Sequence, residues 1–593
     1  MRAALGYNYD VMPPLAIAST VPPDQQPSLA WLAEVAEAML TLQVNSRKIE
    51  KDQERSSPTH GEHEGIRIRI KSGALNAAAI MQHLTDYIMD GGAKGRPSSL
   101  DDYTELFQEV KRPAGTTVYD DDRVFARMRV AGPNPMTIER VAALDDRLPV
   151  TDAQLQAVLG PGDSLARAGE EGRLYLTDYA ILSGAEAGTF PSARKYLSAP
   201  LALFAVPAGR STSRALVPIA IQCEQKPGPS NPVFTPQDGL AWRMAKNVVR
   251  VADGNVHQAS SHLGRTHLVL EPIVVASLRT LAPSHPVSVL LRPHFVGTLE
   301  INDMAQKKLI APGGGVDMVL AGTIETSRAL VVKARESFVF SEAMLPQALR
   351  ARGVLDADAL PDFPYRDDAL LLWEAIREWV DAYLRLYYTS AASVQADPEL
   401  QRWAAEVGAA DGGRLRGFGR DGRFDTVESL ADAITLIVFT ASAQHAAVNF
   451  PQYPIMSYVP NMPLAAYQPA PDRRDGYGEP DLLEMLPPRD MAHMQLSLGY
   501  LLGSLQHTRL GVYPDLSTPR DPSGLLGSVI STLETVADEV AGRAHFADPL
   551  VAEPLARFQK ALAGIESTIE DRNAARVPYT FLLPSRVPAS INI

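Results

Sequence analysis

The sequence predicts a mainly α-helical protein, organised around one long helix with a local bulge and supplemented by a small antiparallel sheet. Long apolar segments at residues 367–388 and 425–449 have the length and pattern of buried helices. Two shorter apolar runs, residues 201–206 and 215–223, flank a stretch rich in turn residues and predict a β-hairpin. Three histidines at five-residue intervals within residues 257–267 predict the bulge.

Before residue 235, the sequence predicts surface coil, several helices and the small sheet. Residues 1–27 are rich in proline and are expected to lie on the surface as coil. Apolar residues at helical spacing predict a helix over residues 28–54, and further helices are expected over residues 74–89 and 100–110. Residues 174–182 are expected to join the hairpin in a small antiparallel sheet.

The histidines His257, His262 and His267 have the wrong spacing for a plain α-helix. A five-residue step turns a side chain by about 140° around such a helix, whereas a four-residue step turns it by only about 40°. A local widening to i→i+5 hydrogen bonding, a π-bulge, restores the alignment, and such bulges are frequent at functional sites. We therefore expect a bulged helix that presents His262 and His267 together.

The residues around this segment suggest where its helix begins and bends. Thr235 and Pro236 form an N-cap and a first-turn proline for a helix that Asp253 and Gly254 are expected to interrupt before the histidines. Pro272 removes a backbone donor and is expected to bend the helix just beyond His267.

A second long helix is predicted over residues 425–449. Asp425 and Glu428 have the spacing of a capping box, and Pro451 is expected to end the helix. Because the segment is hydrophobic nearly all round, it must be buried. A further core helix is expected over residues 496–505, and an amphipathic one over residues 549–572.

The second long helix also carries two candidate metal ligands, His445 and Asn449. Their i,i+4 spacing places both side chains on one helical face. Imidazole nitrogen together with an amide oxygen suits a divalent transition metal better than a hard alkaline-earth ion. The chain ends in an apolar tail, residues 590–593, whose last residue, Ile593, carries a free carboxylate.

Composition excludes several classes of protein. The net charge is −13 and there are no basic runs, which argues against nucleic-acid binding and against a generic patch for anionic membranes. The single cysteine, Cys223, allows neither an intrachain disulfide nor a cysteine-based zinc site. The N-terminal residues lack a continuous apolar stretch, so no secretory signal is expected and a cytoplasmic location is predicted. No apolar stretch approaches the roughly 20 residues of a membrane span.

Taken together, these features resemble the lipoxygenases, non-haem iron dioxygenases of polyunsaturated fatty acids. The resemblance spans some 330 residues in order and rests on the following matches: His-x4-His-x4-His at residues 257–267, Glu271-Pro272, His285-Pro286, Leu290-Leu291 with Pro293-His294, Ile301-Asn302 with Ala305, His445-x3-Asn449-Phe450 with Gln452-Tyr453, and the closing Ile593.

The resemblance implies one helical catalytic domain over residues 1–593, consisting of a coil-like extension (1–27), a helical and small-sheet region (28–234) and an iron-binding helical core (235–593). It does not include the N-terminal lipid-targeting β-sandwich of plant and animal relatives, which we expect to be absent. The implied cofactor is one iron ion per chain, with manganese less favoured, and His257 is implied to lie outside the ligand set. The implied ligands are His262, His267, His445, Asn449 and the Ile593 carboxylate.

The implied reaction is hydrogen abstraction from a bis-allylic carbon of a linoleate- or arachidonate-type fatty acid, followed by addition of O2 to give an S-hydroperoxide. Ala305 matches the position at which lipoxygenases with S-configured products usually carry alanine and those with R-configured products carry glycine. Gln258 and Gln452 match glutamines that connect the asparagine ligand to the substrate channel. Leu309 and Val316 match apolar residues around the pentadiene, and Leu505 is a further candidate. Met462 occupies the place where plant enzymes commonly have a carboxylate-binding arginine.

Two alternatives come from other classes. A catalytically silent lipid-binding protein could retain this fold, although all five ligand positions are intact. A zinc hydrolase would pair its histidines with a carboxylate base, but Glu271 precedes a proline and does not belong to an HExxH pattern. Peripheral contact with a membrane stays open.

Overall fold

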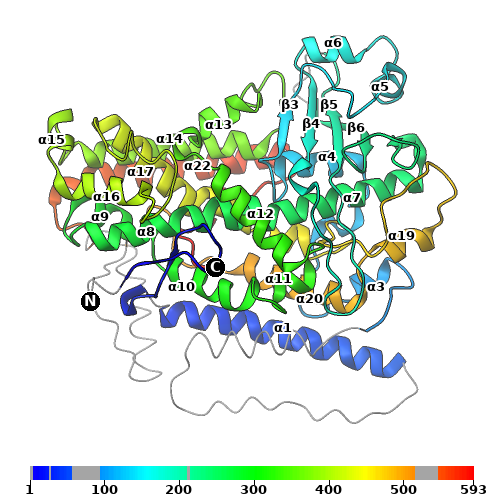
Figure 1. The fold of residues 1–593 in the computed structure, drawn as a ribbon, viewed down its shortest axis with the longest axis horizontal. Coiled ribbons are helices and arrows are strands. Elements are labelled where there is room, and N and C mark those ends of the chain that lie inside the picture. Colours follow the sequence, from blue (N-terminus) through cyan, green and yellow to red (C-terminus); the bar gives the residue numbers. More distant parts are fainter. Residues whose placement is uncertain (1–4, 26–27, 57–93, 210–213, 514–544) are drawn as a thin grey trace.

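The computed structural model describes residues 5–25, 28–56, 94–209, 214–513 and 545–593 (Figure 1). The predicted fold class is confirmed: helices dominate, and the strands form one five-stranded and one two-stranded antiparallel sheet among the described residues. The two-stranded sheet, β1 (Tyr7–Asn8) with β2 (Ile17–Ala18), lies in the otherwise irregular N-terminal segment. No β-sandwich precedes the helices in this described part of the chain.

One continuous helical segment passes through the centre of the molecule: α7 (Leu240–Val256), the π-helix η6 (His257–His267) and α8 (Leu268–Thr280). The predicted interruption at Asp253 and Gly254 is wrong. Asp253 is fully buried and pairs with Arg129, with 2.9 Å between Nη2 and Oδ2. A Cβ on Gly254 would lie 2.7 Å from Leu464 Cδ2. The glycine therefore allows a neighbouring segment to approach the helix rather than ending it.

Pro272 lies inside α8, which continues to Thr280. The carbonyl that loses its backbone donor at this proline, that of Leu268, receives a side-chain donor instead. Arg335 Nε donates to Leu268 O at 3.0 Å, and Asn302 Nδ2 donates to His267 O at 3.3 Å. These bonds explain how the helix accommodates a residue that usually breaks it.

The second central segment comprises α17 (Val427–Phe439), the π-helix η10 (Thr440–Gln444), α18 (His445–Asn449) and the π-helix η11 (Gln452–Met456). Its capping box is formed by Thr426 and Ser429, not by the predicted pair. Pro451 does not end the helical path, because Ile455 N donates to Pro451 O at 2.9 Å and starts the next turn.

By length and composition, the same segment, Val427–Met456, is apolar enough to cross a membrane, although polar residues interrupt it. Of its most apolar window, however, 94% is buried inside the protein. It is a core helix here, as its all-round hydrophobicity predicted.

The five-stranded sheet has the order β3-β4-β5-β6-β7 and is antiparallel throughout. The predicted hairpin is confirmed as β5 (Leu201–Ala205) and β6 (Val217–Gln222), and β4 (Leu174–Asp178) pairs with β5. The short edge strands β3 (Ile138–Arg140) and β7 (Val233–Phe234) were not predicted. A small hydrophobic cluster includes residues of the sheet, of α5 and of α6.

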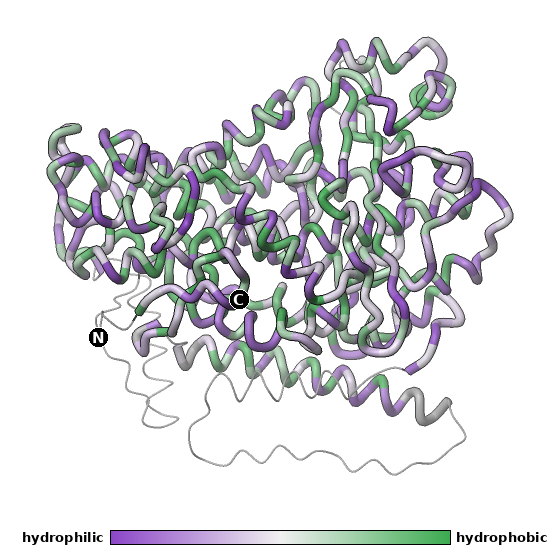
Figure 2. Tube along the Cα trace, in the orientation of Figure 1, coloured by the Kyte–Doolittle hydropathy of each residue, from purple (hydrophilic) through white to green (hydrophobic). Residues whose placement is uncertain are grey.

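Helix α1 (Leu29–Ser56) matches the prediction and lies below α10, α11 and α20 in Figure 1. Hydrophobic and hydrophilic residues alternate in blocks along it (Figure 2), and its buried residues include Trp31, Val35, Leu42 and Ile49. The helix predicted at residues 74–89 lies outside the described residues.

The remaining predicted helices differ from the structure mainly in their ends. The one expected at residues 100–110 is only α3 (Asp101–Thr104), followed by turns. Three others are present as α14 (Pro364–Leu384), α20 (Arg489–Ser504) and α22 (Ala552–Ala575). The other helices are α4 (Asp122–Ala131), α5 (Asp152–Leu159), α6 (Leu165–Glu170), α9 (Pro286–Leu291), α10 (Thr298–Met304), the π-helix η8 (Ala305–Leu309), α11 (Gly315–Val319), α12 (Ile324–Ser337), α13 (Leu345–Ala351), α15 (Ala391–Gln395), α16 (Pro398–Gly408) and α19 (Glu479–Met485).

Candidate metal centre

The two central segments bring three histidines together. The π-helix η6 presents His262 and His267, and α18 presents His445. Nε2 of His262 lies 3.1 Å from Nε2 of His267 and 3.3 Å from Nε2 of His445, and the possible ligand atoms of the three residues all lie within 4.8 Å of one another. The π-helical geometry that the five-residue spacing predicted is thus present, and it aligns the first two imidazoles.

All three histidines are buried, and their environment favours the neutral imidazole. Burial lowers the pKa of His267 to about 4. Burial, followed by the neighbouring histidines, holds the pKa values of His262 and His445 well below their usual range. The neutral form is the one that offers a lone pair to a metal ion.

The tautomer of His267 is determined by its neighbour Asn302. Nδ1 of His267 lies 2.8 Å from Asn302 Oδ1, an atom that only accepts, so Nδ1 carries the proton. The Nε2 lone pair then points toward His262 and His445. Asn302 is oriented in turn by Glu271, whose Oε2 accepts from Asn302 Nδ2 at 2.8 Å. Such a second partner behind a ligating imidazole is typical of metal sites.

Asn449 lies one helical turn after His445 and is held by two hydrogen bonds. Its Nδ2 donates to Leu502 O at 2.7 Å, and its Oδ1 accepts from Gln452 Nε2 at 2.7 Å. Gln452 Oε1 accepts from Gln258 Nε2 at 2.8 Å. The three amides therefore form a chain, and its last member, Gln258, lines the large cavity described below.

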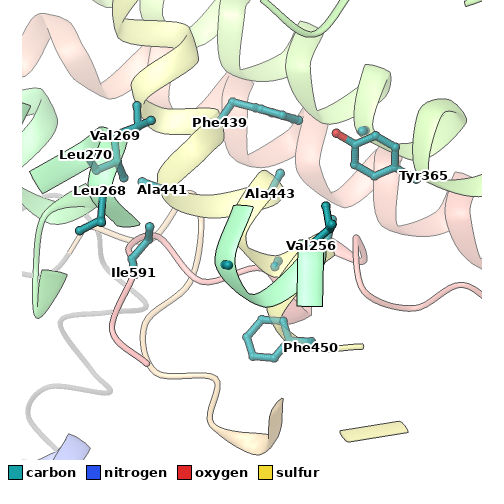
Figure 3. Close-up of a cluster of buried hydrophobic side chains, with 14 of the residues drawn as sticks. Val256, Leu268, Val269, Leu270, Tyr365, Phe439, Ala441, Ala443, Phe450 and Ile591 are labelled. Carbon is teal, nitrogen blue, oxygen red and sulfur yellow. The ribbon is translucent and has the colours of Figure 1, made fainter. Parts of the chain in front are cut away.

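The C-terminal residue lies at the same centre. Ile593 is only 5% exposed, and its main chain lies beside His445, whose pKa it raises against the larger effect of burial. The preceding Ile591 is packed into the buried hydrophobic cluster that also contains Leu268 and Ala441 (Figure 3). The three imidazoles thus meet in the protein interior, with Asn449 one helical turn from His445 and Ile593 beside the cluster, and imidazole nitrogens suit a divalent transition metal.

A large cavity borders His262 and His267. It is lined by His262, His267 and Ile593 and otherwise mainly by apolar side chains. The other predicted residues in its wall are Gln258, Ala305, Leu309 and Val316. Gln452 reaches the cavity only through Gln258.

One expectation about the cavity, the place of Leu505, is wrong. Leu505 is buried but does not line it, and the neighbouring Leu498, Leu501 and Leu502 of α20 do. Met462 is also buried away from the wall, in the packing around Gly254.

Several residues in the wall were not predicted from the sequence. Trp31 and Val35 of α1 line the cavity, and Lys308 contributes a cationic side chain. In sequence, these residues look like any helical core or surface position, so no local signal could have identified them.

The surroundings of Glu271 argue against a hydrolytic centre. Its two carboxylate oxygens accept hydrogen bonds from Ala18 N at 2.7 Å and from Asn302 Nδ2 at 2.8 Å. Glu271 does not line the cavity and therefore cannot act as a general base on a substrate there. The fold and the centre define a helical protein with a buried three-histidine cluster that could hold a transition metal, beside an apolar cavity suited to a lipid chain.

Comparison with known proteins identifies the family. A family model described as Lipoxygenase matches residues 108–495. The chain is 42% identical to the linoleate 9/13-lipoxygenase of Pseudomonas aeruginosa, with 87% of this chain and 72% of that protein covered. Among solved structures, it resembles a coral 8R-lipoxygenase (TM-score 0.82, 28% identity) and a lipoxygenase crystallised with arachidonate (TM-score 0.81, 29% identity); each comparison covers 100% of this chain and 80% of the other.

The chain belongs to the lipoxygenase family and is a dioxygenase of that family. Lipoxygenases are generally non-haem iron enzymes, and the three-histidine cluster could hold a metal ion.

Proposed function

We propose that this protein is an iron lipoxygenase that converts linoleate- or arachidonate-type fatty acids into S-hydroperoxides. The observation that carries the proposal is the convergence of three neutral imidazoles, of which His262 and His267 line a large apolar cavity. The similar Pseudomonas aeruginosa enzyme is named for linoleate, and a structural neighbour was crystallised with arachidonate. We further propose that residues 1–593 form a single catalytic domain.

His262, His267, His445, Asn449 and the Ile593 carboxylate would hold the iron, with manganese a less favoured occupant. Four neutral donors and one carboxylate leave room for a further ligand. When bound, the iron supplies the one-electron oxidation that abstraction of a bis-allylic hydrogen requires. The hydrogen bond from Gln452 holds the Asn449 amide in place, and Gln258 connects this contact to the substrate cavity.

The cavity wall would orient the fatty acid. Leu309 of η8 and Val316 of α11 line the cavity. Helix α11 packs against both η8 and α20. Apolar side chains at these positions would pack against the pentadiene and exclude water from its radical. Ala305 lies one turn before Leu309, and its methyl group would occupy the space through which O2 reaches the nearer radical carbon, so that oxygen adds at the far end. This assigns the S product to Ala305.

Metal analysis combined with an ultraviolet assay for conjugated dienes tests the proposal. We expect about one iron per purified chain and diene formation with a lag that added hydroperoxide removes. His267→Gln should lose iron and activity. His257→Gln is the matched control: His257 lies in the same π-helix, and its Nε2 is 2.7 Å from Val448 O rather than at the centre.

Two outcomes would contradict the proposal. Full iron content and full rate in the His267→Gln protein would show that the histidine cluster is not the metal site. A wild-type protein that retains fatty acid but forms no diene, with or without iron, would instead support the lipid-binding alternative.

A further inference from the structure

Three backbone carbonyls of the C-terminal tail, those of Ala589, Ile591 and Asn592, each accept a hydrogen bond from one side chain. His294 Nδ1 donates to Ala589 O at 2.7 Å, and Thr298 Oγ1 donates to Ile591 O at 3.1 Å. Both donors belong to the segment from η7 (Arg292–His294) to the first residue of α10. The third carbonyl, that of Asn592, receives its hydrogen bond from a distant part of the chain.

That third donor is the indole of Trp31 in α1. Its Nε1 lies 2.6 Å from Asn592 O, and the two residues are 561 positions apart in the sequence. Trp31 is only 4% exposed, so water does not compete for this bond. Its side chain lines the large cavity and also a second, smaller cavity that Asn592 borders. The indole therefore lies between the two cavities.

We propose that Trp31 is a positioning residue for the carboxylate of Ile593. This inference rests on the proposed function, in which that carboxylate binds iron. The carbonyl of Asn592 and the N and Cα atoms of Ile593 belong to one planar peptide unit. A hydrogen bond that holds the oxygen therefore also holds the orientation of this plane, and only the two backbone dihedrals of Ile593 remain to place its carboxylate. Removing the donor would leave a buried carbonyl unpaired and would let the plane rotate.

Release of ferrous iron from anaerobic holoenzyme to a coloured chelator measures this role independently of turnover. Trp31→Phe keeps an aromatic ring but lacks the donor, and Trp31→Leu, measured in parallel, lacks it as well. Trp242→Phe is the matched control, because it removes another buried indole donor, one that bonds Asp122 Oδ1 at 2.8 Å away from the centre. Both Trp31 variants should release iron about tenfold faster than wild type, while Trp242→Phe should release it at the wild-type rate.

Thermal unfolding of the same proteins separates positioning from a general loss of stability. Trp31→Phe and Trp242→Phe each remove one buried indole donor, so their melting temperatures should fall by similar amounts, while only the Trp31 variants should release iron faster. Equal acceleration in Trp242→Phe, or wild-type release from both Trp31 variants, would overturn the inference and leave the proposed function intact. A wild-type protein that binds no iron would overturn both.

Discussion

Gly297 offers a sharp test of how the C-terminal tail is placed, because two separate features require a glycine there. The residue precedes α10 with a φ of +81°, a conformation that L side chains rarely adopt. A Cβ at this position would also lie 3.0 Å from Asn592 Cβ and 3.4 Å from Asn592 Cα. Gly297→Ala should therefore combine backbone strain with a steric push on the residue before Ile593.

The two effects can be separated by a second glycine. Gly184 has nearly the same φ, +78°, but a Cβ there would meet nothing within 4 Å. Each substitution should cost about 1–2 kcal/mol of stability through left-handed backbone strain. Only Gly297→Ala should in addition displace Asn592 by a few tenths of an ångström. A displacement of about 1 Å can lower a rate by about a hundredfold, so this smaller one should lower kcat by about tenfold.

Thermal unfolding, iron content and steady-state diene formation should be measured on both alanine variants. We expect similar losses in melting temperature, while iron retention and kcat fall only in Gly297→Ala. Equal catalytic rates in the two variants, with equal melting temperatures, would show that the placement of the tail does not control the centre. A kcat loss in Gly184→Ala as large as that in Gly297→Ala would also refute the reasoning, because Gly184 has no contact with the tail.

Three further predictions concern the C-terminus, the product and a buried carboxyl. Adding one residue after Ile593 moves the terminal carboxylate by about 3.5 Å, so the extended protein should lose iron and activity; wild-type turnover would exclude this carboxylate as a ligand. Wild-type enzyme should form mainly S-hydroperoxide, and Ala305→Gly should add an R product shifted along the pentadiene; chiral chromatography that finds mainly R product from wild type, or an unchanged ratio in the variant, would remove Ala305 from the mechanism. Burial raises the pKa of Glu271 from 4.5 to about 7, so its contribution to stability is lost as the pH rises from 4.5 through 7, by about 3 kcal/mol at about 1.4 kcal/mol per pH unit. In denaturant titrations, the stability of wild type relative to Glu271→Gln should fall by about this amount over that range, and a difference independent of pH would contradict the assignment.

Parts of this structure follow from local geometry and were predictable. The direction of a side chain depends on the turn of its helix, so the spacing of His262 and His267 was sufficient to predict a π-helix. The alternation of apolar runs with turn residues likewise predicted β5 and β6, because a hairpin is formed by neighbours in sequence. The all-round hydrophobicity of residues 430–448 predicted a buried helix for the same reason.

Predictions failed where a distant contact overrides a local preference. Asp253 and Gly254 form a turn signal, but the buried Arg129 pairs with the aspartate and a neighbouring segment packs against the glycine. Pro272 remains within a helix because Arg335 supplies the hydrogen bond that its ring removes, and Asn302 donates to the neighbouring His267 carbonyl. None of these partners lies near enough in sequence to have been recognised.

By itself, the sequence determined the helical class and, through its matches to one family, the candidate donors at the centre. The tertiary structure decided where those donors meet and which side chains surround the cavity. Leu498, Leu501 and Leu502 have ordinary core spacing, and a leucine facing a cavity has the same local sequence signature as one facing another side chain. The contact between Trp31 and Asn592 joins opposite ends of the chain. Only the packing of the whole fold determines whether such residues touch, because their separation in sequence places no constraint on their separation in space.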